Sequence, residues 1–520
     1  MKSELFLLAV SSLGAGGGVE CHDRFAPLVR EVAVDDPVWT AAFLGWLRGQ
    51  DGLRGAALTG AMEATKAMLA NGLPGSRGIV ESVLRRADDP GDALSYWVER
   101  YGRSIPKPVK RAMADAVARL YTEPAMLKHD TAAKGFRFAD VIALVHPAPR
   151  APWQADLFRV ARDRRHQRAE ISSYGSLPML AANARLRAAA DSTLLLDPAR
   201  LKAAGMTWEG VLSLAGSDVE RRLLWPAVIP SMGYLALLLN LRHFDEADVH
   251  DDVAAGVSAR IADPARVARS GQLPFRFVTV HEQSPSLRWG HALARALQAS
   301  LANLPRLPGR TLVLVDTSAS MANPPLFGPV TVRTPLTPAK AAAVFAVALA
   351  AGGDGVELFG FADGRFRHEV PPDGPVLKEA NRFLARTGEA GHATRAADAL
   401  RATYSGQERV VIISDRSILD AEIAHRVPPK VPVYAINLGA ASRCGPVTTS
   451  PGRHELTSLD DATFRMIPLL EAGVAGAWPW LMPASWHIAG QAAHVLGRPA
   501  SWLHLGGMDE AERTNDLKYD

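Results

Sequence analysis

The 520-residue sequence has few cysteines and no long hydrophobic run. Cys21 and Cys444 lie far apart, so the chain has neither a disulfide framework nor a cysteine-rich zinc site, and such usage is typical of the cytoplasm. No segment approaches the roughly 18 consecutive apolar residues of a membrane span. The short apolar run LFLLAV follows Glu4 and leads to no clear cleavage site. It therefore predicts a first helix rather than a signal peptide.

Motifs of catalysis are also missing. The sequence has no P-loop, no HExxH zinc motif and no nucleophile paired with a base at a recognisable spacing. Its 15 histidines are scattered and form no cluster of metal ligands. These absences disfavour an enzyme and leave binding or scaffolding as the expected class of function.

The length and composition indicate a globular chain of several domains. At roughly 100 to 200 residues per domain, the length predicts two to four of them. The hydrophobic fraction of 48% and the charged fraction of 22% exclude a wholly disordered or collagen-like chain. The net charge of +4 is mild, so the distribution of charge is more informative than its sum.

Positive charge gathers in two short segments, residues 99–111 and 158–168. The second segment holds five arginines against Asp163. Such local excesses suit phosphate groups, although a solvated helix face has the same pattern. The first segment sets one acid, Glu99, against Arg100, Arg103, Lys107, Lys110 and Arg111.

The pattern of the chain changes at about residue 306. From about residue 20 to 300, apolar residues recur at intervals of three and four, and prolines and glycines separate segments of helical length. A long series of helices without strands predicts stacked helix pairs, an α-solenoid. Beyond Pro308, apolar strands alternate with helical segments, which predicts a mostly parallel sheet covered by helices on both faces. The expected strands are 311–316, 356–363, 409–415 and 431–439, and the expected helices are 338–351, 376–386, 395–403 and 418–426.

Oxygen-bearing side chains stand where these strands end. Asp316, Ser318 and Ser320 form a D-x-S-x-S loop, Thr394 lies in a G-x-x-T loop, and Asp415 ends a later strand. Because the carboxyl ends of parallel strands meet at one edge of a sheet, these side chains are expected to lie together. Oxygen ligands suit Mg²⁺ or another divalent cation. In the alternative interpretation, the hydroxyls only cap the following helix and bond one another.

This part of the chain resembles a von Willebrand factor A domain with its metal-ion-dependent adhesion site. The resemblance implies that the same five residues coordinate the ion and that a carboxylate of a partner completes its shell. Arg416 follows Asp415 and places a cation beside this site.

The helical half resembles the TROVE domain of Ro proteins, and the order of the two domains strengthens the resemblance. It covers roughly residues 20–470 and is carried by segments 96–121, 135–149, 223–244 and 273–282. It implies an N-terminal, all-α, HEAT-like helical ring (TROVE) and a C-terminal, doubly wound, Rossmann-like α/β domain of the von Willebrand factor A type. The expected domains are residues 1–305 for the ring, 306–472 for the α/β domain and 473–520 for a tryptophan-rich extension.

The resemblance also implies a non-catalytic, cytoplasmic, RNA-binding scaffold. The implied partners are small non-coding Y-like RNAs, misfolded RNAs with single-stranded 3′ ends and, in bacteria, an exoribonuclease of the polynucleotide phosphorylase type. Phosphate contacts would supply affinity and unpaired bases specificity. The alternative is a metal-dependent protein-interaction module on a helical scaffold, without an RNA role. The residues expected to bind RNA are Arg100, Arg103, Lys107, Lys110, Arg111, Lys128, Lys134 and Arg137.

Two features lie outside the family pattern. Phe138 occupies the position of a family histidine that supports RNA binding, and it either stacks on a base or packs in the core. The C-terminal extension holds Trp478, Trp480, Trp486 and Trp502. Packing on the preceding domain is favoured over a partner surface for these tryptophans.

Overall fold

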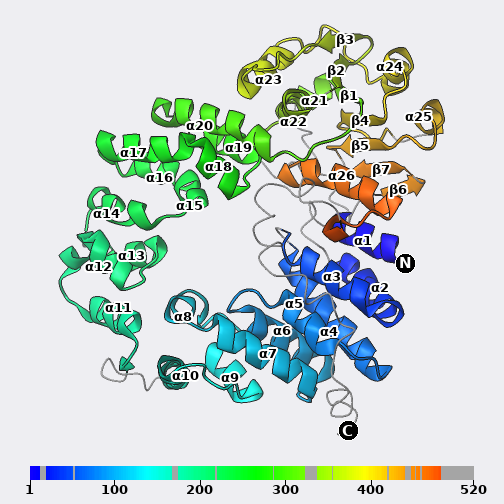
Figure 1. Ribbon diagram of the computed structural model, residues 1–520. Coiled ribbons are helices and arrows are strands. Elements are labelled where there is room, and N and C mark those ends of the chain that lie inside the picture. Colours follow the sequence, from blue (N-terminus) through cyan, green and yellow to red (C-terminus); the bar gives the residue numbers. More distant parts are fainter. Residues whose placement is uncertain are drawn as a thin grey trace.

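The computed structural model contains a long series of helices followed by one seven-stranded sheet (Figure 1). The division of the chain into a helical part and an α/β part is therefore confirmed. The residues that the structure describes are 1–11, 19–50, 53–166, 174–216, 219–284, 286–322, 336–353, 355–418, 421–439, 447–450, 452–456 and 459–481.

Helices occupy the described chain up to residue 303. The first group is α1 (Lys2–Ser11), α2 (Val19–Asp35), α3 (Pro37–Leu47), α4 (Arg54–Ala70), α5 (Ser76–Val83), α6 (Asp89–Tyr101), α7 (Lys107–Leu120), α8 (Glu123–His129), α9 (Phe138–Val145) and α10 (Pro152–Arg165). The second group is α11 (Pro178–Ala188), η2 (Ser192–Leu196), α12 (Pro198–Ala203), α13 (Trp208–Ala215), α14 (Arg221–Val228), η3 (Ile229–Ser231), α15 (Tyr234–Leu239), α16 (Leu241–Glu246), α17 (Asp251–Ala262), α18 (Pro264–Ser270), α19 (Pro274–Gln283), α20 (Leu287–Ser300) and η4 (Leu301–Asn303).

Local sequence explains where these helices begin and which face they bury. In α3, Asp36 precedes the first turn and its carboxylate accepts a hydrogen bond from the backbone N–H of Trp39 at 2.9 Å. In α7, a proline lies in the first turn, where no helical N–H is needed. Its buried residues recur at intervals of three and four: Val109, Ala112, Met113, Ala116 and Val117.

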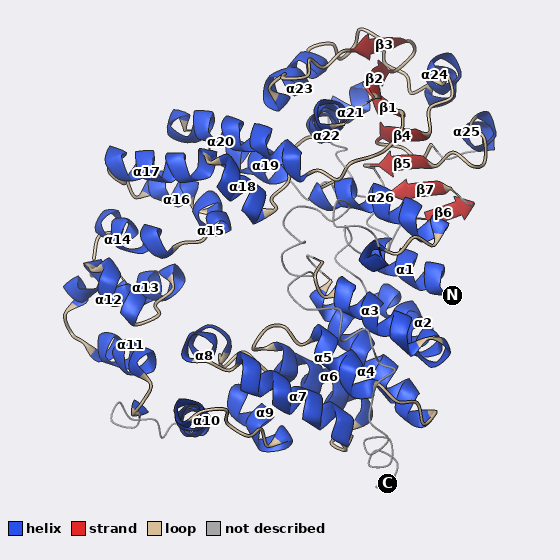
Figure 2. Cartoon of the chain, viewed as in Figure 1, coloured by secondary structure: helices blue, strands red, loops and turns tan. Residues whose placement is uncertain are grey.

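The helices follow a curved path that brings the two ends of the described chain together (Figure 1). Figure 2 shows the path running from α1 through α10, on through α14 to α20, and back by way of the sheet. The last long helix, α26 (Asp461–Ala475), lies beside α1, and the backbone of Gly473 contacts the side chains of Phe6 and Leu7. The expected helical ring is present, and the α/β part completes it.

Aromatic side chains hold this closure. After α26, the short helix η5 (Pro479–Leu481) brings Trp480 next to Trp478, with ring centroids 5.9 Å apart and an interplanar angle of 8°. Both rings lie within 5.5 Å of Trp39 on α3, and Phe6 on α1 lies 5.5 Å from Trp478. The prediction of packing is therefore confirmed for Trp478 and Trp480, although the aromatic rings that they contact belong to α1 and α3 and not to the preceding α/β domain.

The remaining two tryptophans of the extension, Trp486 and Trp502, lie outside the described residues.

The α/β part has the strand order β3-β2-β1-β4-β5-β7-β6. The five central strands are parallel, and the outer strands β3 and β6 run antiparallel to their neighbours. The strands are β1 (Thr311–Asp316), β2 (Val356–Phe361), β3 (Arg365–His368), β4 (Arg409–Ser414), β5 (Val433–Asn437), β6 (Val447–Ser450) and β7 (Arg453–Leu456). The helices between them are α21 (Ala319–Ala322), α22 (Pro338–Gly352), α23 (Val376–Leu384), α24 (Ala396–Thr403) and α25 (Ala421–Arg426).

Four of these strands and their helices were predicted from apolar runs. Three predicted strands, 356–363, 409–415 and 431–439, are longer than the observed ones, because the residues at their ends turn away from the sheet. Strands β3, β6 and β7 were not predicted. Each has only four residues and contains charged or hydroxyl side chains, so none forms an apolar run.

Alternating side chains divide the central strands between two apolar layers. Leu312 and Leu314 of β1 pack with residues of α24 and α25, and Val313 and Val315 face a larger core that includes α22 and α26. That larger core continues into the helical part of the chain. The sheet is therefore covered by helices on both faces, as expected for a doubly wound α/β domain.

A mixed polar and aromatic contact joins the two parts. The carboxylate of Asp461, at the start of α26, accepts hydrogen bonds from the backbone N–H groups of Phe275 at 2.9 Å and Arg276 at 3.2 Å. Both donors lie in the first turn of α19, so Asp461 caps a helix of the other part. Beside this cap, the rings of Phe345 and Phe464 stack with centroids 4.4 Å apart.

No helix in the described part of the chain is long and apolar enough to cross a membrane.

Candidate functional site

The predicted metal ligands meet where strands β1 and β4 end. Asp316, the last residue of β1, is only 1% exposed. Its carboxylate accepts hydrogen bonds from the backbone N–H of Ser318 at 2.8 Å, the hydroxyl of Thr394 at 3.1 Å and the hydroxyl of Ser414 at 2.7 Å. The hydroxyls of Ser318 and Ser320 lie 3.2 Å apart. Loops that are distant in sequence thus converge on one buried carboxylate.

The loop that carries Thr394 is held by Asp363, which sequence reasoning missed. One carboxylate oxygen of Asp363 accepts hydrogen bonds from the backbone N–H groups of His392 at 2.8 Å and Ala393 at 3.2 Å. These bonds hold the pKa of the Asp363 carboxyl below its usual range. Gly391 has φ +94°, and a Cβ there would lie 2.3 Å from the same carboxylate, so the glycine permits the close approach.

Asp415 follows Ser414 and contains a buried carboxylate oxygen, Oδ1, without a hydrogen-bond partner in the described chain. Its backbone carbonyl lies against Gly439, at the end of the neighbouring strand β5. Arg416 is exposed, and its N–H donates to the Ser414 hydroxyl at 3.2 Å. Ser414 was also missed, and its position beside the predicted Asp415 was the available signal.

The described residues contain no group of three or more His, Cys, Asp or Glu side chains that could hold a metal ion. The cluster around Asp316 has two carboxylates, and its remaining side-chain oxygens belong to hydroxyl groups. Its hydroxyls bond one another and Asp316, which is what the capping alternative also expects.

The predicted basic segment spans the end of α6 and the start of α7. Arg103, Lys107 and Arg111 are exposed, and Lys110 is half-buried. Neither Arg103 nor Lys110 forms a hydrogen bond or ion pair with the described residues. Arg100 is also exposed, but its Nε lies 3.5 Å from the buried carboxylate of Glu63. This segment therefore presents several cations to solvent.

The second predicted group, Lys128, Lys134 and Arg137, is divided by the structure. Lys128 is exposed on α8 and forms no hydrogen bond or ion pair among the described residues. Lys134 donates to the carboxylates of Asp88 and Asp92, each at 3.0 Å. Burial disfavours the charge of Lys134, but these hydrogen bonds outweigh it and raise its pKa.

Arg137 binds Asp130, with its Nη2 atom 2.9 Å from Oδ2, and its side chain is only 15% exposed. The charges of Lys134 and Arg137 are therefore balanced inside the protein, which favours a structural role for both.

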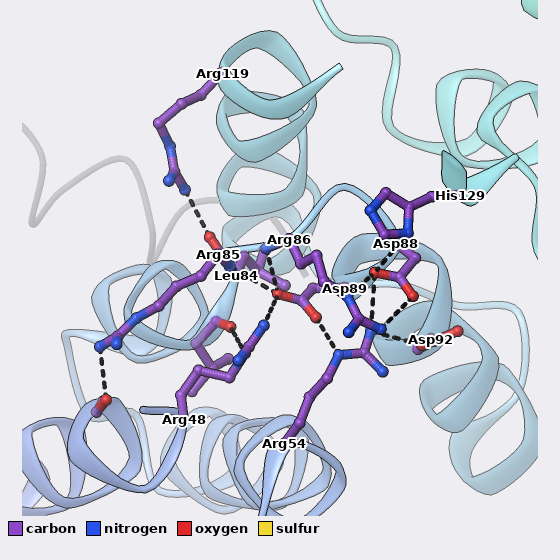
Figure 3. Close-up of polar contacts among 12 residues, drawn as sticks. Arg48, Arg54, Leu84, Arg85, Arg86, Asp88, Asp89, Asp92, Arg119 and His129 are labelled. Atoms are coloured by element: carbon purple, nitrogen blue, oxygen red, sulfur yellow. Dashed lines mark hydrogen bonds and ion pairs between the residues drawn. The ribbon is translucent and has the colours of Figure 1, made fainter. Parts of the chain in front are cut away.

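Lys134, from the segment between α8 and α9, joins a network of ion pairs formed by residues just after α3, on α4, and in α6 and the loop before it. Figure 3 shows the part of this network around Asp88 and Asp89. At its centre, Asp89 is fully buried and accepts from Arg48 at 2.8 Å and from Arg54 at 2.7 Å. The neighbouring Asp88 is bound by Arg86. Burial opposes ionisation of Asp88, but the hydrogen bonds from Arg86 and Lys134 hold its pKa well below the usual range.

Phe138 packs in the core. It is 2% exposed, and its ring stacks on Tyr121 with centroids 3.7 Å apart and an interplanar angle of 12°. The core alternative for this residue is therefore confirmed, and its ring has no face available for a base.

The arginines of α10, like Lys128, Lys134 and Arg137, include residues that pair with an acid and residues that face solvent. Arg159 lies near Asp156 and Asp163, and Arg165 bonds Asp140 at 3.1 Å. Arg162 is exposed without an ion pair in the described chain. Arg168, at the end of this patch, lies outside the described residues.

The chain is similar to known proteins in one sequence segment and in its fold. Residues 163–308 match the family model described as "TROVE domain". No curated protein matches the sequence. The crystal structure of the Deinococcus radiodurans Ro (Rsr) protein matches with a TM-score of 0.63 and 16% sequence identity, covering 91% of this chain and all of that one.

The segment that matches the TROVE model lies almost entirely within the helical part and contains none of the residues expected to bind RNA or metal. The structural match extends over both parts of the molecule. The chain therefore contains a segment, residues 163–308, that matches the TROVE domain, and it shares its fold with the Deinococcus radiodurans Ro (Rsr) protein.

Proposed function

We propose that the protein is a non-catalytic, RNA-binding scaffold of the Ro type that acts in the cytoplasm. The observation that carries the proposal is the row of cations from Arg100 to Arg111, exposed except for the half-buried Lys110, on a protein with the Ro fold. Exposed cations release counterions from RNA phosphates when they bind, which supplies affinity that is independent of sequence. Lys128 extends this set, whereas Lys134 and Arg137 are assigned to internal ion pairs.

Neutralising the cations at the start of α7 tests this proposal. Replacing Lys107, Lys110 and Arg111 by glutamine should weaken binding of a labelled structured RNA. It should also lower the slope of log K against log salt by about 0.9 for each phosphate that the variant no longer neutralises. Fluorescence anisotropy at several KCl concentrations measures both quantities.

A matched control neutralises three exposed arginines that already face a nearby carboxylate: Arg200, Arg242 and Arg266. This control should leave the salt slope close to that of the wild type. An equal decrease of slope in both triple variants would contradict a specific interface at α7.

The RNA ligands are proposed to be small Y-like RNAs and misfolded RNAs with single-stranded 3′ ends, with a polynucleotide phosphorylase-type exoribonuclease as the protein partner. A structured RNA and the same RNA with a single-stranded 3′ extension, compared in competition, separate the two modes. Tighter binding of the extended RNA supports recognition of 3′ ends, because unpaired bases offer contacts that a duplex hides.

We further propose that Asp316, Ser318, Ser320, Thr394 and Asp415 hold Mg²⁺ or another divalent cation. The donor set fits such an ion, because all side-chain donors are oxygens and the buried Asp415 Oδ1 lacks a partner among the described residues. The metal would supply a positive centre that an acidic group of a partner protein could complete. This is also the basis of the alternative function, a metal-dependent protein-interaction module.

Thermal melting in Mg²⁺ or Mn²⁺ tests the metal site. The wild type should show a saturable rise in melting temperature, since a ligand that binds only the folded state stabilises it. Asp316→Ala and the nearly isosteric Thr394→Val should reduce this rise, and Asp398→Ala, at an exposed position of α24, should retain it. If the wild type shows no response, the capping alternative holds and no metal-dependent docking occurs.

A further inference from the structure

A buried carboxylate lies beneath the surface formed by α2, α4 and α6. Glu63 of α4 is 1% exposed and accepts a hydrogen bond from the hydroxyl of Tyr96 at 2.5 Å. Two arginines approach the same carboxylate from different helices. The Nε of Arg30 on α2 lies 2.8 Å from Oε2, and the Nε of Arg100 on α6 lies 3.5 Å from Oε1.

The arrangement differs from the ion pairs of Asp89, whose partners Arg48 and Arg54 are 12% and 24% exposed, because its cations are more accessible. The side chains of Arg30 and Arg100 are 39% and 53% exposed, whereas Glu63 is almost fully buried. A guanidinium carries five N–H donors in a planar fork, and the Nε atom of each arginine faces the carboxylate. Glu63 thus restrains two forks that stay open to solvent.

A third cation lies on the same surface. Lys66 follows Glu63 by one turn of α4, is exposed, and places its ammonium 5.4 Å from the ring centroid of Tyr101. Burial, followed by the nearby Glu63 carboxylate, raises the pKa of Tyr101 to about 12, so its hydroxyl stays neutral. Arg30, Lys66 and Arg100 thus gather around Glu63 and Tyr101.

A purely structural role accounts poorly for the burial of Glu63. Removing a carboxylate from water costs several kcal/mol, and apolar side chains of similar volume often hold helices together equally well. A buried carboxylate that keeps two accessible arginines in place has a further use, since a restrained fork loses less entropy when it binds an anion.

We infer that Arg30, Lys66 and Arg100 form one phosphate-binding site, oriented by Glu63, that extends the RNA interface onto α2 and α4. The inference rests on the proposed RNA-binding function, because Arg100 is shared with the cationic segment that continues to α7. Arginine forks contact two non-bridging oxygens of a phosphate at once, and the lysine adds a point charge. The site recognises the RNA backbone and not its bases.

The double variant Arg30→Gln, Lys66→Gln tests the site without altering α7. Removing two cations that each neutralise a phosphate should lower the slope of log K against log salt by about 1.8, at about 0.9 per phosphate. The matched control is Arg242→Gln, Arg266→Gln, which should leave the slope unchanged. Arg30→Lys keeps the charge but removes the fork, so it should also weaken binding. Melting temperatures confirm that each variant is folded.

Replacing Glu63 by glutamine separates orientation from simple charge. Glu63→Gln adds one net positive charge, so electrostatic attraction alone predicts tighter RNA binding. If Glu63 positions the arginines, the variant binds RNA more weakly in spite of its higher charge. Tighter binding by a folded Glu63→Gln protein would overturn the positioning role. If this variant does not fold, the Arg30 variants decide.

The two proposals fail in different ways. If the wild type binds no RNA, the proposed function fails and this inference falls with it. If the triple variant at α7 lowers the salt slope but Arg30→Gln, Lys66→Gln does not, only the inference is wrong.

Discussion

The predicted polar side chains are arranged differently in the helical part and in the α/β part of this molecule. At the edge of the sheet, Asp316, Ser318, Ser320 and Asp415 lie at or just beyond strand ends, and Thr394 reaches them from the loop before α24. Four of these five predicted ligands are joined by hydrogen bonds. On the helices, the predicted cations divide between exposed residues such as Lys128 and paired residues such as Lys134. Strand ends are forced to one edge by backbone hydrogen bonding, whereas a helix surface lets a long side chain turn toward any nearby acid.

The largest expected effect is a loss of folding stability when the ion pairs of the helical part are broken. Asp89→Ala leaves the largely buried guanidinium groups of Arg48 and Arg54, 12% and 24% exposed, without their shared carboxylate, so the free energy of unfolding should fall by about 3–5 kcal/mol. Urea denaturation measures this change. Asp115→Ala, which removes an exposed pair with Arg77, should cost at most about 1 kcal/mol. Similar decreases for both variants would contradict the structural role of the buried network.

A prediction of intermediate size concerns the loss of folding stability at acid pH, which we expect to arise mainly in the α/β part. Burial, aided by nearby arginines, lowers the pKa of His368 and of His454 from 6.5 to about 4. Because the folded-state pKa is lower, the unfolded state binds more protons between these values. Stability is therefore complete above pH 6.5 and is lost as the pH falls toward 4, by up to about 1.4 kcal/mol per pH unit for each histidine.

Substitution of one histidine checks this assignment. His454 is 1% exposed and stacks on Tyr434, so His454→Phe preserves an aromatic ring and removes the titrating group. Melting temperatures measured from pH 7 to pH 4 should fall less steeply for this variant than for the wild type. The exposed His250 provides the control, and His250→Phe should leave the profile unchanged. An unaltered profile for His454→Phe would show that another group is responsible.

The smallest effect separates an exposed cation from a paired one. Lys128→Gln should lower the salt slope of RNA binding by about 0.9 and leave stability unchanged. Lys134→Gln removes ion pairs with two carboxylates at a partly accessible site, so stability should fall by about 0–1 kcal/mol while the slope stays the same. Anisotropy and urea denaturation on the same samples measure both quantities. The reverse pattern would mean that Lys134 leaves Asp88 to bind RNA.

Much of the α/β part could be predicted because its strands are apolar runs bounded by turns. Strand β1 was predicted with its observed bounds, and β2, β4 and β5 were predicted within a few residues. The short strands β3 and β7 could not be predicted in this way. Their pairing with β2 and β5 is decided by the neighbouring strand, and their own residues give no strong signal.

The candidate sites were predictable to different degrees. The residues around Asp316 follow a spaced motif, so their positions could be inferred, but Asp363 acts through a turn after another strand and has no motif. In the helical part, Arg100 was expected from its charged segment. Glu63, Arg30 and Lys66 lie on two other helices and come together with it only when those helices pack.

The sequence by itself determined the two-part architecture, the core-facing residues of the helices and the loop from Asp316 to Ser320, because each depends on local periodicity or spacing. Tertiary structure decided which cations remain exposed, since Lys134 and Arg137 meet carboxylates on neighbouring elements. It also decided the closure of the chain, in which Phe6 of the first helix meets Trp478 near the end of the described chain. Such contacts join residues far apart in sequence, and only the packing of the whole chain brings them together.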